Sequence, residues 1–496
     1  MPEFSVANLP EIFVSDTAIS KLVSDAVERG QLRRLASRLY SRNLKEDPAK
    51  LVRRNWSRLI AGYYPDALIA DRTALESQPA EDGSVFLISN KKRDTELPGV
   101  TFRPRKGPGP LDSDKPFVGG ARLSSVPRAY LENMRASRAR DNRTPRTLTR
   151  AELETRLDAL IRRQGEDAVN KLRNDARAIA PRLGLQKEYE DLSALIGTLL
   201  GTHDVKMQSN AGKARAAGQP FDPDRVRLFE TLFRALRENI SPDRPARERD
   251  PDANGTLAFF EAYFSNFIEG TEFSVKEAED IIFNGVIPTE RPEDAHDVLG
   301  TFRIVSDQGE MQRTPKDITE FIDFLRWRHA VIMEARPNTN PGSFKTKSNQ
   351  AGMTVFVPPE LVIGTLEKGF EFLEGLADPF QKAAFMMILV SEVHPFADGN
   401  GRIGRIMMNA ELVAAGQERI IVPTAFRTDY LGPLKAFSQN GETAPLIRML
   451  DVAQRYTHGI DWRDLHSAQA ILEKNNAFAE GEDAKLRVDW RTWPAK

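Results

Sequence analysis

An apolar run that ends at a histidine and a proline constrains the fold of this chain more than any other feature. Residues 383–393 read AAFMMILVSEV, and their apolar side chains recur at the spacing of a buried helix. Pro395 cannot continue that helix, because its ring would clash with the preceding turn. A second helical pattern, RIGRIMMNAELVAAG, begins at residue 402. The stretch HPFADGNGRIGR (394–405) therefore predicts a loop that joins two helices and leads into a helix N-terminus.

The composition of this loop predicts an anion site. Gly399 and Gly401 can adopt backbone angles that other residues avoid, so the N–H groups around Asn400 can point into one concavity. The positive end of the following helix lies behind them. Arg402 and Arg405 add guanidinium groups that suit phosphate oxygens.

Asp398 and His394 extend this anion site toward catalysis. A carboxylate is expected beside phosphates when a cation lies between them, and Mg²⁺ is commonly held by one carboxylate plus substrate phosphates. A histidine at this place is a base with a suitable pKa. Together the residues predict phosphoryl or nucleotidyl transfer from a nucleotide to a hydroxyl group. The alternative is a histidine that caps a helix beside an incidental glycine-rich turn.

The stretch 394–405 matches the Fic signature HxFx[D/E]GNGRxxR at every fixed position, and the resemblance extends over about residues 255–455. It implies an all-helical domain with a small β-hairpin. Many members of this family transfer AMP from ATP to a Ser, Thr or Tyr hydroxyl of a target protein. By this resemblance His394 is the general base, Asp398 is the Mg²⁺ ligand, and the ATP phosphates are bound by Gly399, Asn400, Gly401, Arg402 and Arg405.

Two further segments resemble parts of the Fic domain. Residues 337–362 resemble the segment with the target-docking hairpin, or flap, which implies a target protein docked near 344–357; family members usually have arginine in place of Lys345. The segment VPTAFRTDYLGPLKAFSQNGETAPLIRML resembles the helices that wall the base pocket. Tyr430 and Gln439 are the candidates there, although family members often place an asparagine near Gln439. The alternative for both is ordinary packing and surface polarity.

A helical pattern near residues 262–282 contains SNFIEG, in which Ser265 and Glu269 share one helix face. With Gly270, this resembles the Fic inhibitory motif [S/T]xxxE[G/N]. A Glu269 carboxylate that reached Arg405 would occupy the site of the γ-phosphate and turn ATP away from its productive pose. The resemblance therefore implies autoinhibition by an upstream helix. The alternatives are a solvated glutamate and a glutamate that helps to remove AMP.

Charge is unevenly distributed along the chain. Residues 1–150 hold 27 Lys and Arg against 18 Asp and Glu, a net charge of +9, whereas the chain as a whole has a net charge of −1. This asymmetry indicates an anionic partner such as nucleic acid for the first region. The alternative is ordinary variation in solvated faces.

The basic region has the pattern of a mixed α/β module. Residues 17–29 have the apolar spacing of a helix, Gly30 is placed to end it, and QLRRLASRLYSRN predicts one or two short basic strands. The strand-like pieces DALIAD, SVFLIS and GVTFRPR follow, broken by KKRDTELP. Residues 15–130 thereby resemble AbiEi-type antitoxins and regulators, which place a winged helix before a mixed α/β domain. This resemblance implies DNA contact through residues 15–45, with Arg33, Arg34, Arg38 and Arg42 as the phosphate-contact candidates. The alternative is a module that binds protein or supports the Fic core.

The sequence thus predicts a multidomain protein, in which a mainly helical Fic core with a small hairpin flap follows a mixed α/β, winged-helix-like region. The expected parts are a basic region over 1–145, a helical support region over 146–254, the Fic domain over 255–455 and a helical extension over 456–496. The segments 209–223 and 241–255 are rich in Gly, Pro and charge, which predicts loops.

Composition excludes several classes. Without cysteine there is no disulfide framework and no thiolate metal site. The chain has no apolar run near 18 residues and no secretory pattern at its start, so we expect a cytoplasmic protein without a membrane span. A Fic AMP-transferase, acting on a target or on itself, is the leading hypothesis. The alternatives are de-AMPylation or another phosphate transfer by the same site, and a DNA-bound regulator fused to a Fic toxin of a toxin–antitoxin pair. A homodimer that pins the inhibitory helix is a further expectation from the resemblance.

Overall fold

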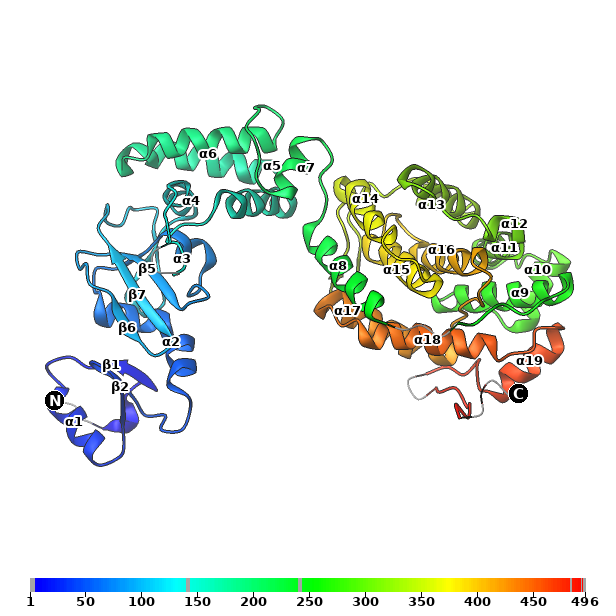
Figure 1. The fold of residues 1–496 in the computed structure, drawn as a ribbon, viewed down its shortest axis with the longest axis horizontal. Helices are drawn as coiled ribbons and strands as arrows, with labels where there is room; N and C mark the ends of the chain where they lie inside the picture. The colour runs from blue at the N-terminus through cyan, green and yellow to red at the C-terminus, as the bar shows by residue number, and fades with distance from the viewer. Residues whose placement is uncertain (1–4, 140–142, 240–242, 482–483, 492, 494–496) are drawn as a thin grey trace. The chain divides into compact units, whose positions relative to one another are not determined.

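The computed structural model describes residues 5–139, 143–239, 243–481, 484–491 and 493. The chain divides into two compact units, residues 1–218 and 219–496 (Figure 1). The boundary falls inside the predicted support region 146–254, so the helices of that region are shared between the two units.

The first unit is mixed α/β, as predicted. Its strands form a three-stranded antiparallel sheet in the order β1-β3-β2 and a six-stranded mixed sheet in the order β6-β7-β5-β4-β9-β8. The strands are β1 (Ile12–Val14), β2 (Arg33–Ala36), β3 (Leu39–Ser41), β4 (Leu68–Ile69), β5 (Ser84–Ile88), β6 (Thr95–Leu97), β7 (Val100–Arg105), β8 (Lys115–Pro116) and β9 (Arg122–Leu123). The α-helices are α1 (Ser20–Glu28), α2 (Pro48–Tyr63), α3 (Asp71–Glu76), α4 (Val126–Met134), α5 (Arg150–Leu183), α6 (Gln186–Leu199) and α7 (Asn210–Ala216).

Two stretches of this unit that the sequence assigned to breaks are ordered elements. Within KKRDTELP, β6 pairs with β7, and Leu97 lies opposite Val100 and is buried. Within 209–223, α7 forms because the Ser209 side chain accepts a hydrogen bond from the Gly212 N–H at 3.0 Å. A buried carboxylate, Asp158 of α5, then pairs with Arg215. Tertiary partners thus override the loop-like composition of both stretches.

The second unit is helical apart from one hairpin, which confirms the predicted Fic-like architecture. Its α-helices are α8 (Pro223–Glu238), α9 (Pro251–Ile268), α10 (Val275–Asn284), α11 (Pro292–Ser306), α12 (Gln308–Met311), α13 (Ile318–Ile332), α14 (Val362–Leu373), α15 (Pro379–Val393), α16 (Asn400–Ala414), α17 (Arg427–Asn440), α18 (Ala444–His458) and α19 (Leu465–Lys474). The hairpin consists of β10 (Gln350–Ala351) and β11 (Thr354–Val355). Short 3₁₀ turns across the two units are η1 (Val6–Asn8), η2 (Val118–Gly120), η3 (Pro337–Thr339), η4 (Pro359–Leu361) and η5 (Thr424–Phe426).

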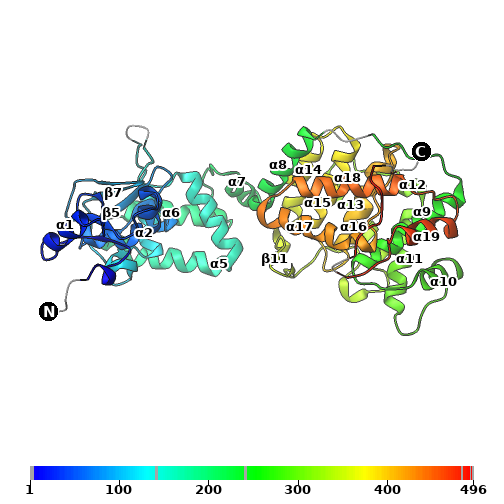
Figure 2. The same cartoon turned by 90° about the horizontal axis from the view of Figure 1, so that it is seen from below.

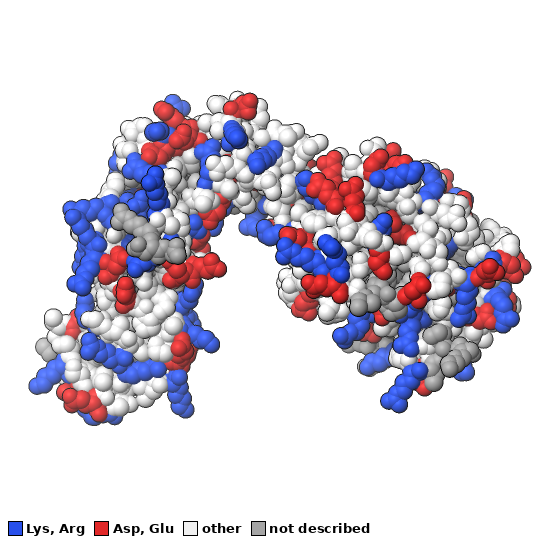
Figure 3. Space-filling model, viewed as in Figure 1, with Lys and Arg blue, Asp and Glu red and all other residues white. Residues whose placement is uncertain are grey.

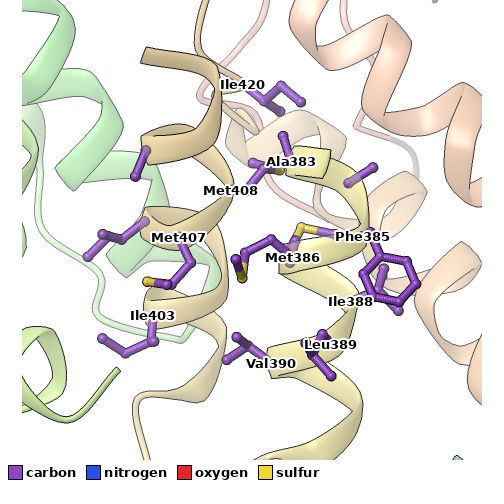
Figure 4. Close-up of a cluster of buried hydrophobic side chains, with 14 of the residues drawn as sticks. Ala383, Phe385, Met386, Ile388, Leu389, Val390, Ile403, Met407, Met408 and Ile420 are labelled. Carbon is purple, nitrogen blue, oxygen red and sulfur yellow. The ribbon is translucent and has the colours of Figure 1, made fainter. Parts of the chain in front are cut away.

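Helices α15 and α16 form the centre of this unit and lie side by side (Figures 1 and 2). In Figure 4, Met386 and Val390 of α15 point toward α16, and Met408 of α16 points toward α15. All three are fully buried. Burying a side chain of this size contributes about 1.5–3 kcal/mol, so the pair holds the loop between the two helices in place.

The predicted inhibitory helix is two helices. Helix α9 begins at Pro251, inside the stretch 241–255 that predicted a loop, because Asp250 caps it by accepting a hydrogen bond from the Ala253 N–H at 2.8 Å. It ends at Ile268, and Gly270 has a φ of +93° that breaks the helical path. A capping box at Ser274 then starts α10. The C-terminal extension contains α19, and the described residues after it form no helix or strand.

None of the helices in the described ranges is long and apolar enough to cross a membrane.

Candidate active site

The loop between α15 and α16 turns sharply at His394. Its backbone is left-handed, with a φ of +52°, and its N–H still donates to the Val390 carbonyl at 2.9 Å. Pro395 disfavours a helical conformation at the residue before it, which ends α15 here. Asn400 then closes the loop, because its Oδ1 accepts from the Phe396 N–H at 2.8 Å and its Nδ2 donates to the Phe396 carbonyl at 3.0 Å. The Asn400 side chain is therefore committed to the loop, and only its backbone is available to a ligand.

The first turn of α16 keeps its N–H groups free of a side-chain cap. Asp378 caps α15 through the Gln381 N–H, whereas α16 has Gly399 at its N-cap and no side-chain hydrogen bond there. Gly399 has a φ of +74°. Uncapped N–H groups at a helix N-terminus attract anions, so this backbone is compatible with the anion site that the sequence predicts.

The His394 ring is held in a fixed orientation. It stacks on Phe356 with ring centroids 3.7 Å apart and an angle of 4° between the planes. Its Nδ1 lies 3.3 Å from the Ser391 carbonyl oxygen, a contact that favours hydrogen on Nδ1 and leaves the Nε2 lone pair available. Burial lowers the pKa of His394 to about 4, although the Ser391 carbonyl and the Glu269 charge oppose this shift. The imidazole is therefore neutral near pH 7, as a general base must be.

A second histidine fixes the loop from behind. The His329 ring stacks on Phe396 with centroids 3.7 Å apart. Its Nδ1 accepts from the Gly342 N–H at 2.9 Å, so its Nε2 carries hydrogen toward the Asp398 carbonyl oxygen at 3.1 Å. Burial lowers the pKa of His329 to about 4. Its role is therefore to position the loop.

Arg405 is held by the last turn of α9. Its Nη2 contacts the Glu269 Oε1 at 2.7 Å and the Ser265 carbonyl oxygen at 2.8 Å, and its Nε donates to the Ser265 Oγ at 3.0 Å. The side chain of Arg405 is 5% exposed and that of Glu269 is 33% exposed. Burial alone would lower the pKa of Arg405, but Glu269 and Tyr430 hold it above its ordinary value. The guanidinium face that a phosphate would need is thus occupied by a carboxylate that borders solvent.

Gly401 makes this contact sterically possible. A Cβ atom at residue 401 would lie 2.1 Å from the Glu269 Oε1 and 2.9 Å from its Cδ. Real Cβ atoms do not approach other atoms so closely, so any other residue would expel the carboxylate or a ligand in its place. Glu269 and the first turn of α16 therefore share one tight space. Gly270, which follows in the inhibitory motif, has open space around it.

A cavity of about 220 Å³ opens beside these groups. Its walls come from the hairpin, the end of α15, the start of α16 and one face of α17. The α17 face is largely apolar near Arg405 and polar farther on. The lining residues are Glu269, Ala351, Thr354, Phe356, Ser391, Glu392, His394, Gly401, Arg405, Tyr430, Leu431, Leu434, Lys435 and Ser438.

The structure does not place Arg402 where the sequence predicted. Its guanidinium is buried and contacts the Asp297 Oδ2 at 2.6 Å and the Asn266 Oδ1 at 3.3 Å, away from the residues that line the cavity. Arg336 also donates to the Asp297 Oδ2, at 2.9 Å. Arg402 therefore ties α16 to α9 and α11, because a buried guanidinium requires a carboxylate partner. Of the two signature arginines, only Arg405 lines the cavity.

Asp398 is available to a cation. Its side chain is 57% exposed, and its Oδ1 accepts a hydrogen bond from the Gly399 N–H at 2.7 Å. Its Oδ2 lies 3.9 Å from the Arg402 Nη2. Groups of three or more His, Cys, Asp or Glu that could hold a metal are absent from the part of the chain that the structure describes. A metal at Asp398 would thus depend on ligands from a bound nucleotide.

The two base-pocket candidates have different surroundings. Tyr430 lines the cavity, and its hydroxyl accepts a hydrogen bond from the Arg405 Nη1 at 3.4 Å. Gln439 is exposed and is not among the lining residues, because it lies one residue past Ser438 and so about 100° around the helix. The neighbouring residue Ser438 lines the cavity, and the role of Gln439 stays a prediction.

The hairpin is tied to the signature loop. The Lys345 N–H donates to the Pro395 carbonyl at 2.9 Å, and its Nζ donates to the Asn349 Oδ1 at 2.7 Å and to the Val393 carbonyl at 3.4 Å. Asn349 in turn donates to the Phe396 carbonyl at 2.9 Å. Burial lowers the pKa of Lys345 to about 8. Lysine here serves as an anchor between the flap segment and the loop.

The outer edge of the hairpin is exposed. Met353, at its turn, is 91% exposed, and Val355 is also largely exposed. Both lie inside the segment 344–357 that the sequence assigned to target docking. An exposed methionine at the turn of a hairpin suits contact with a polypeptide partner.

Three residues of the cavity region were missed by sequence reasoning. Glu392 and Ser438 line the cavity, and Arg225 of α8 joins them: its Nη1 contacts the Glu392 Oε2, and its Nη2 donates to the Val355 carbonyl at 2.7 Å. Burial raises the pKa of Glu392, against the opposing effect of Arg225 and Ser438. A signal existed, because Glu392 is the single charged residue in the apolar run 383–393, and a buried carboxylate requires a partner.

The four DNA-contact candidates bind their own unit. Each donates to backbone carbonyls within residues 5–64: Arg33 to Glu46, Arg34 to Ala36, Arg38 to Ser15 and Gly62, and Arg42 to Ala7. On the face shown in Figure 3, Lys and Arg side chains are spread over both units with acidic side chains among them. DNA binding through residues 15–45 therefore stays a prediction, as does the winged-helix resemblance.

Known proteins share the central part of this chain. Residues 318–412 match the Fic/DOC family. Protein adenylyltransferase fic-1 of Caenorhabditis elegans is 27% identical over 198 residues, which cover 38% of this chain and 38% of that protein. Protein adenylyltransferase Fic of Drosophila melanogaster is 26% identical over 237 residues, which cover 45% of this chain and 47% of that protein. The match thus spans less than half of the length of either relative.

A Fic-domain-containing signaling protein from Bacteroides thetaiotaomicron is similar in structure, with a TM-score of 0.38 and 16% identity over 49% of this chain and 97% of that one. The helical second unit, with its signature loop and hairpin, carries a Fic domain. Residues 318–412 of the chain are thus a Fic/DOC domain.

Proposed function

We propose that this chain is a protein adenylyltransferase that moves AMP from ATP to a Ser, Thr or Tyr hydroxyl of a target protein or of itself, and that Glu269 inhibits it. The observation that carries the proposal is the contact between the Glu269 Oε1 and the Arg405 Nη2 at 2.7 Å, inside a cavity that His394 also lines. A base, an uncapped helix N-terminus and a guanidinium converge there, as transfer of a nucleotidyl group from a nucleoside triphosphate requires.

His394 would act as the general base. The target hydroxyl oxygen forms a bond to the α-phosphorus of ATP, and its proton passes to the Nε2 of His394. The bond from the α-phosphorus to the bridging oxygen breaks, and pyrophosphate leaves. The neutral ring and its stacking on Phe356 at 3.7 Å support this role, because the base must be unprotonated and positioned.

Glu269 would compete with the γ-phosphate for Arg405. Both are anionic, and the Gly401 Cα leaves room for one of them against the first turn of α16. With the carboxylate in place, ATP binds without its γ-phosphate on Arg405, so its α-phosphorus is displaced from His394. Release of Glu269 toward solvent, which its 33% exposure supports, would open the site.

Asp398 would hold a Mg²⁺ ion beside the phosphates. Its exposed carboxylate is a hard oxygen ligand with room for water and phosphate ligands around it, the coordination that Mg²⁺ prefers. The bound ion would supply charge neutralisation at the phosphates.

Label transfer from [α-³²P]ATP with Mg²⁺ tests this proposal. The protein would be compared with Glu269→Gly and with Glu269→Gly/His394→Ala, with EDTA as a control for the metal. We expect strong labelling in Glu269→Gly alone. Equal labelling of the unchanged protein and Glu269→Gly would contradict inhibition by Glu269 and leave the transferase. No labelling in any variant, with ATP still bound, would contradict AMP transfer and favour another donor or AMP removal.

Several expectations stay predictions. They are docking of a target at the exposed hairpin edge, DNA binding by the first unit as part of a regulator or toxin–antitoxin pair, a homodimer and a cytoplasmic location.

A further inference from the structure

Glu392 is a buried carboxylate in the cavity wall with one oxygen unused. It is 3% exposed and lies two residues before His394 on α15. Its Oε2 contacts Arg225 and accepts from the Ser438 Oγ at 3.2 Å. Its Oε1 has no hydrogen-bond partner among the described residues, although Glu392 lines the cavity. This oxygen is not among the buried side-chain atoms that lack a partner, so it borders the cavity and can accept a hydrogen bond from a ligand there.

Arg225 fixes that carboxylate with respect to three walls of the cavity. It comes from α8, and its guanidinium contacts Glu392 of α15, the Ser438 Oγ of α17 at 3.1 Å and the Val355 carbonyl of β11 at 2.7 Å. Because Arg225 also donates to the Ser438 Oγ, that hydroxyl uses its own hydrogen on the Glu392 Oε2. The acceptor left over at this end of the cavity is therefore the Glu392 Oε1.

The position of Glu392 along the cavity is that of a nucleobase. Tyr430 marks the phosphate end of the α17 face, since its hydroxyl contacts Arg405. Ser438 lies eight residues farther on, about 12 Å along a helix. A nucleotide whose terminal phosphate lay at Arg405 would place its base near this far end. Leu431 and Leu434 line the cavity between, which suits the apolar faces of a purine.

We propose that the Glu392 Oε1 accepts a hydrogen bond from the 6-amino group of adenine, with Arg225 and Ser438 holding the carboxylate in position, and that this contact makes the site selective for ATP. The inference rests on the proposed function, because it takes ATP as the bound nucleotide. It assigns base recognition to α8 and α15, outside the α17 residues from which the sequence predicted it.

The test is equilibrium binding by calorimetry in the Glu269→Gly protein, with ATP and with purine riboside 5′-triphosphate, which lacks only the 6-amino group. We expect ATP to bind about tenfold or more tightly, as a hydrogen bond to a buried charged acceptor implies. In Glu392→Leu/Arg225→Met the two nucleotides should bind within about twofold of each other. Removing both partners avoids an unpaired buried charge, so this variant keeps a foldable core.

Glu411→Leu is the matched control, because Glu411 is a buried carboxylate of α16 outside the cavity lining. It should keep the preference for ATP. Equal binding of the two nucleotides by the Glu269→Gly protein, an unchanged preference in Glu392→Leu/Arg225→Met, or tighter binding of GTP than ATP would each overturn the inference. A preference for ATP without any AMP transfer would support the inference and contradict the proposed function. AMP transfer without the preference would do the reverse.

Discussion

Two buried arginine–carboxylate pairs, one in each unit, differ in what surrounds them. In the first unit Arg128 contacts the Asp114 Oδ2 at 2.7 Å, and both side chains are 0% exposed. Arg128 also contacts the Glu132 Oε1 at 2.9 Å and donates to the carbonyls of Pro108 and Gly109. Every partner is fixed, so the cluster is a structural anchor for α4.

In the second unit Arg405 is almost as deeply buried, but one partner can leave. Glu269 borders solvent at the end of α9, and the pair lines a cavity. Gly401 supplies the space in which an anion can replace the carboxylate. A ligand can therefore replace a partner in the Arg405 pair, whereas the Arg128 cluster leaves no such opening.

The largest effect on stability is expected from the fully buried pair of Arg128 and Asp114. Arg128→Met leaves Asp114 buried without its partner, which costs about 3–5 kcal/mol. Chemical unfolding of the full chain should show this loss in the transition of the first unit, while ATP binding by the folded fraction stays unchanged. Arg135→Met is the control, because the Arg135–Glu188 pair is largely exposed on the arginine side and should cost less than about 1 kcal/mol. Equal losses of unfolding free energy in both variants would show that the buried pair contributes no more than an exposed pair.

The pair of Arg405 and Glu269, which borders the cavity, should affect the rate of AMP transfer. In the Glu269→Gly protein, Arg405→Met removes the guanidinium that would contact the terminal phosphate, and the initial rate of AMP transfer should fall about 10²–10³-fold. Since Glu269 is already absent, this variant leaves no unpaired carboxylate and should unfold at nearly the same denaturant concentration. A fall of less than about threefold would place Arg405 with Arg128 as a structural residue.

Gly401→Ala tests the shared space. The added methyl group would lie where the Glu269 Oε1 lies, 2.1 Å away, so it blocks the carboxylate and a phosphate alike. The rate of AMP transfer should therefore fall about 10²-fold even in the Glu269→Gly background, because a displacement of the reacting groups by about 1 Å has an effect of this size. Gly432→Ala, on α17 with open space around it, is the control and should have no effect. Higher activity in Gly401→Ala than in the unchanged protein would mean that only Glu269 uses this space.

A smaller effect is expected from pH. Since burial lowers the pKa of His394 to about 4, the ring stays neutral as pH falls through 6.5, and protonation removes the base only near pH 4. The rate of transfer by Glu269→Gly should thus change less than about twofold between about pH 7 and pH 5. A base with an ordinary histidine pKa would lose more than about tenfold over this range. Rates from single-turnover labelling across this range distinguish the two cases.

Local chemistry decided which parts of the site were predictable. The turn at His394 and the uncapped start of α16 follow from Pro395 and the glycines, which act within a few residues. The direction of Arg402 depends on Asp297 in another helix, and no local pattern carries that information. The contact of Arg225 with Glu392 spans 167 residues of sequence. Helix α7 has a local cap at Ser209, but the α5 residue that pairs with its Arg215 could not be predicted from the local sequence.

The fold shows the same division. The mainly helical Fic core was predictable from apolar periodicity and the signature. The split of the predicted inhibitory helix into α9 and α10 also follows from local signals, Gly270 and the capping box at Ser274, although the sequence analysis treated the segment as one helix. Spacing placed Ser265 and Glu269 on one helix face, and only the tertiary structure could bring that face to Arg405. Side chains whose partners are local were thus predictable, and those that join distant helices were not.

The smallest effect separates two neighbours on α17. Gln439 is exposed and outside the cavity lining, so Gln439→Ala should leave ATP binding unchanged and shift the free energy of unfolding by less than about 0.5 kcal/mol. Ser438→Ala removes the hydroxyl that contacts Glu392 and should weaken ATP binding several-fold, since a hydrogen bond to a charged group contributes about 1.5–3 kcal/mol at most. Calorimetric titration of both variants with ATP measures the difference. If Gln439→Ala weakened ATP binding more than Ser438→Ala, Gln439 would be the base-pocket residue, as the sequence predicted. The face of α17 that carries it would then have to rotate toward the cavity when the nucleotide binds.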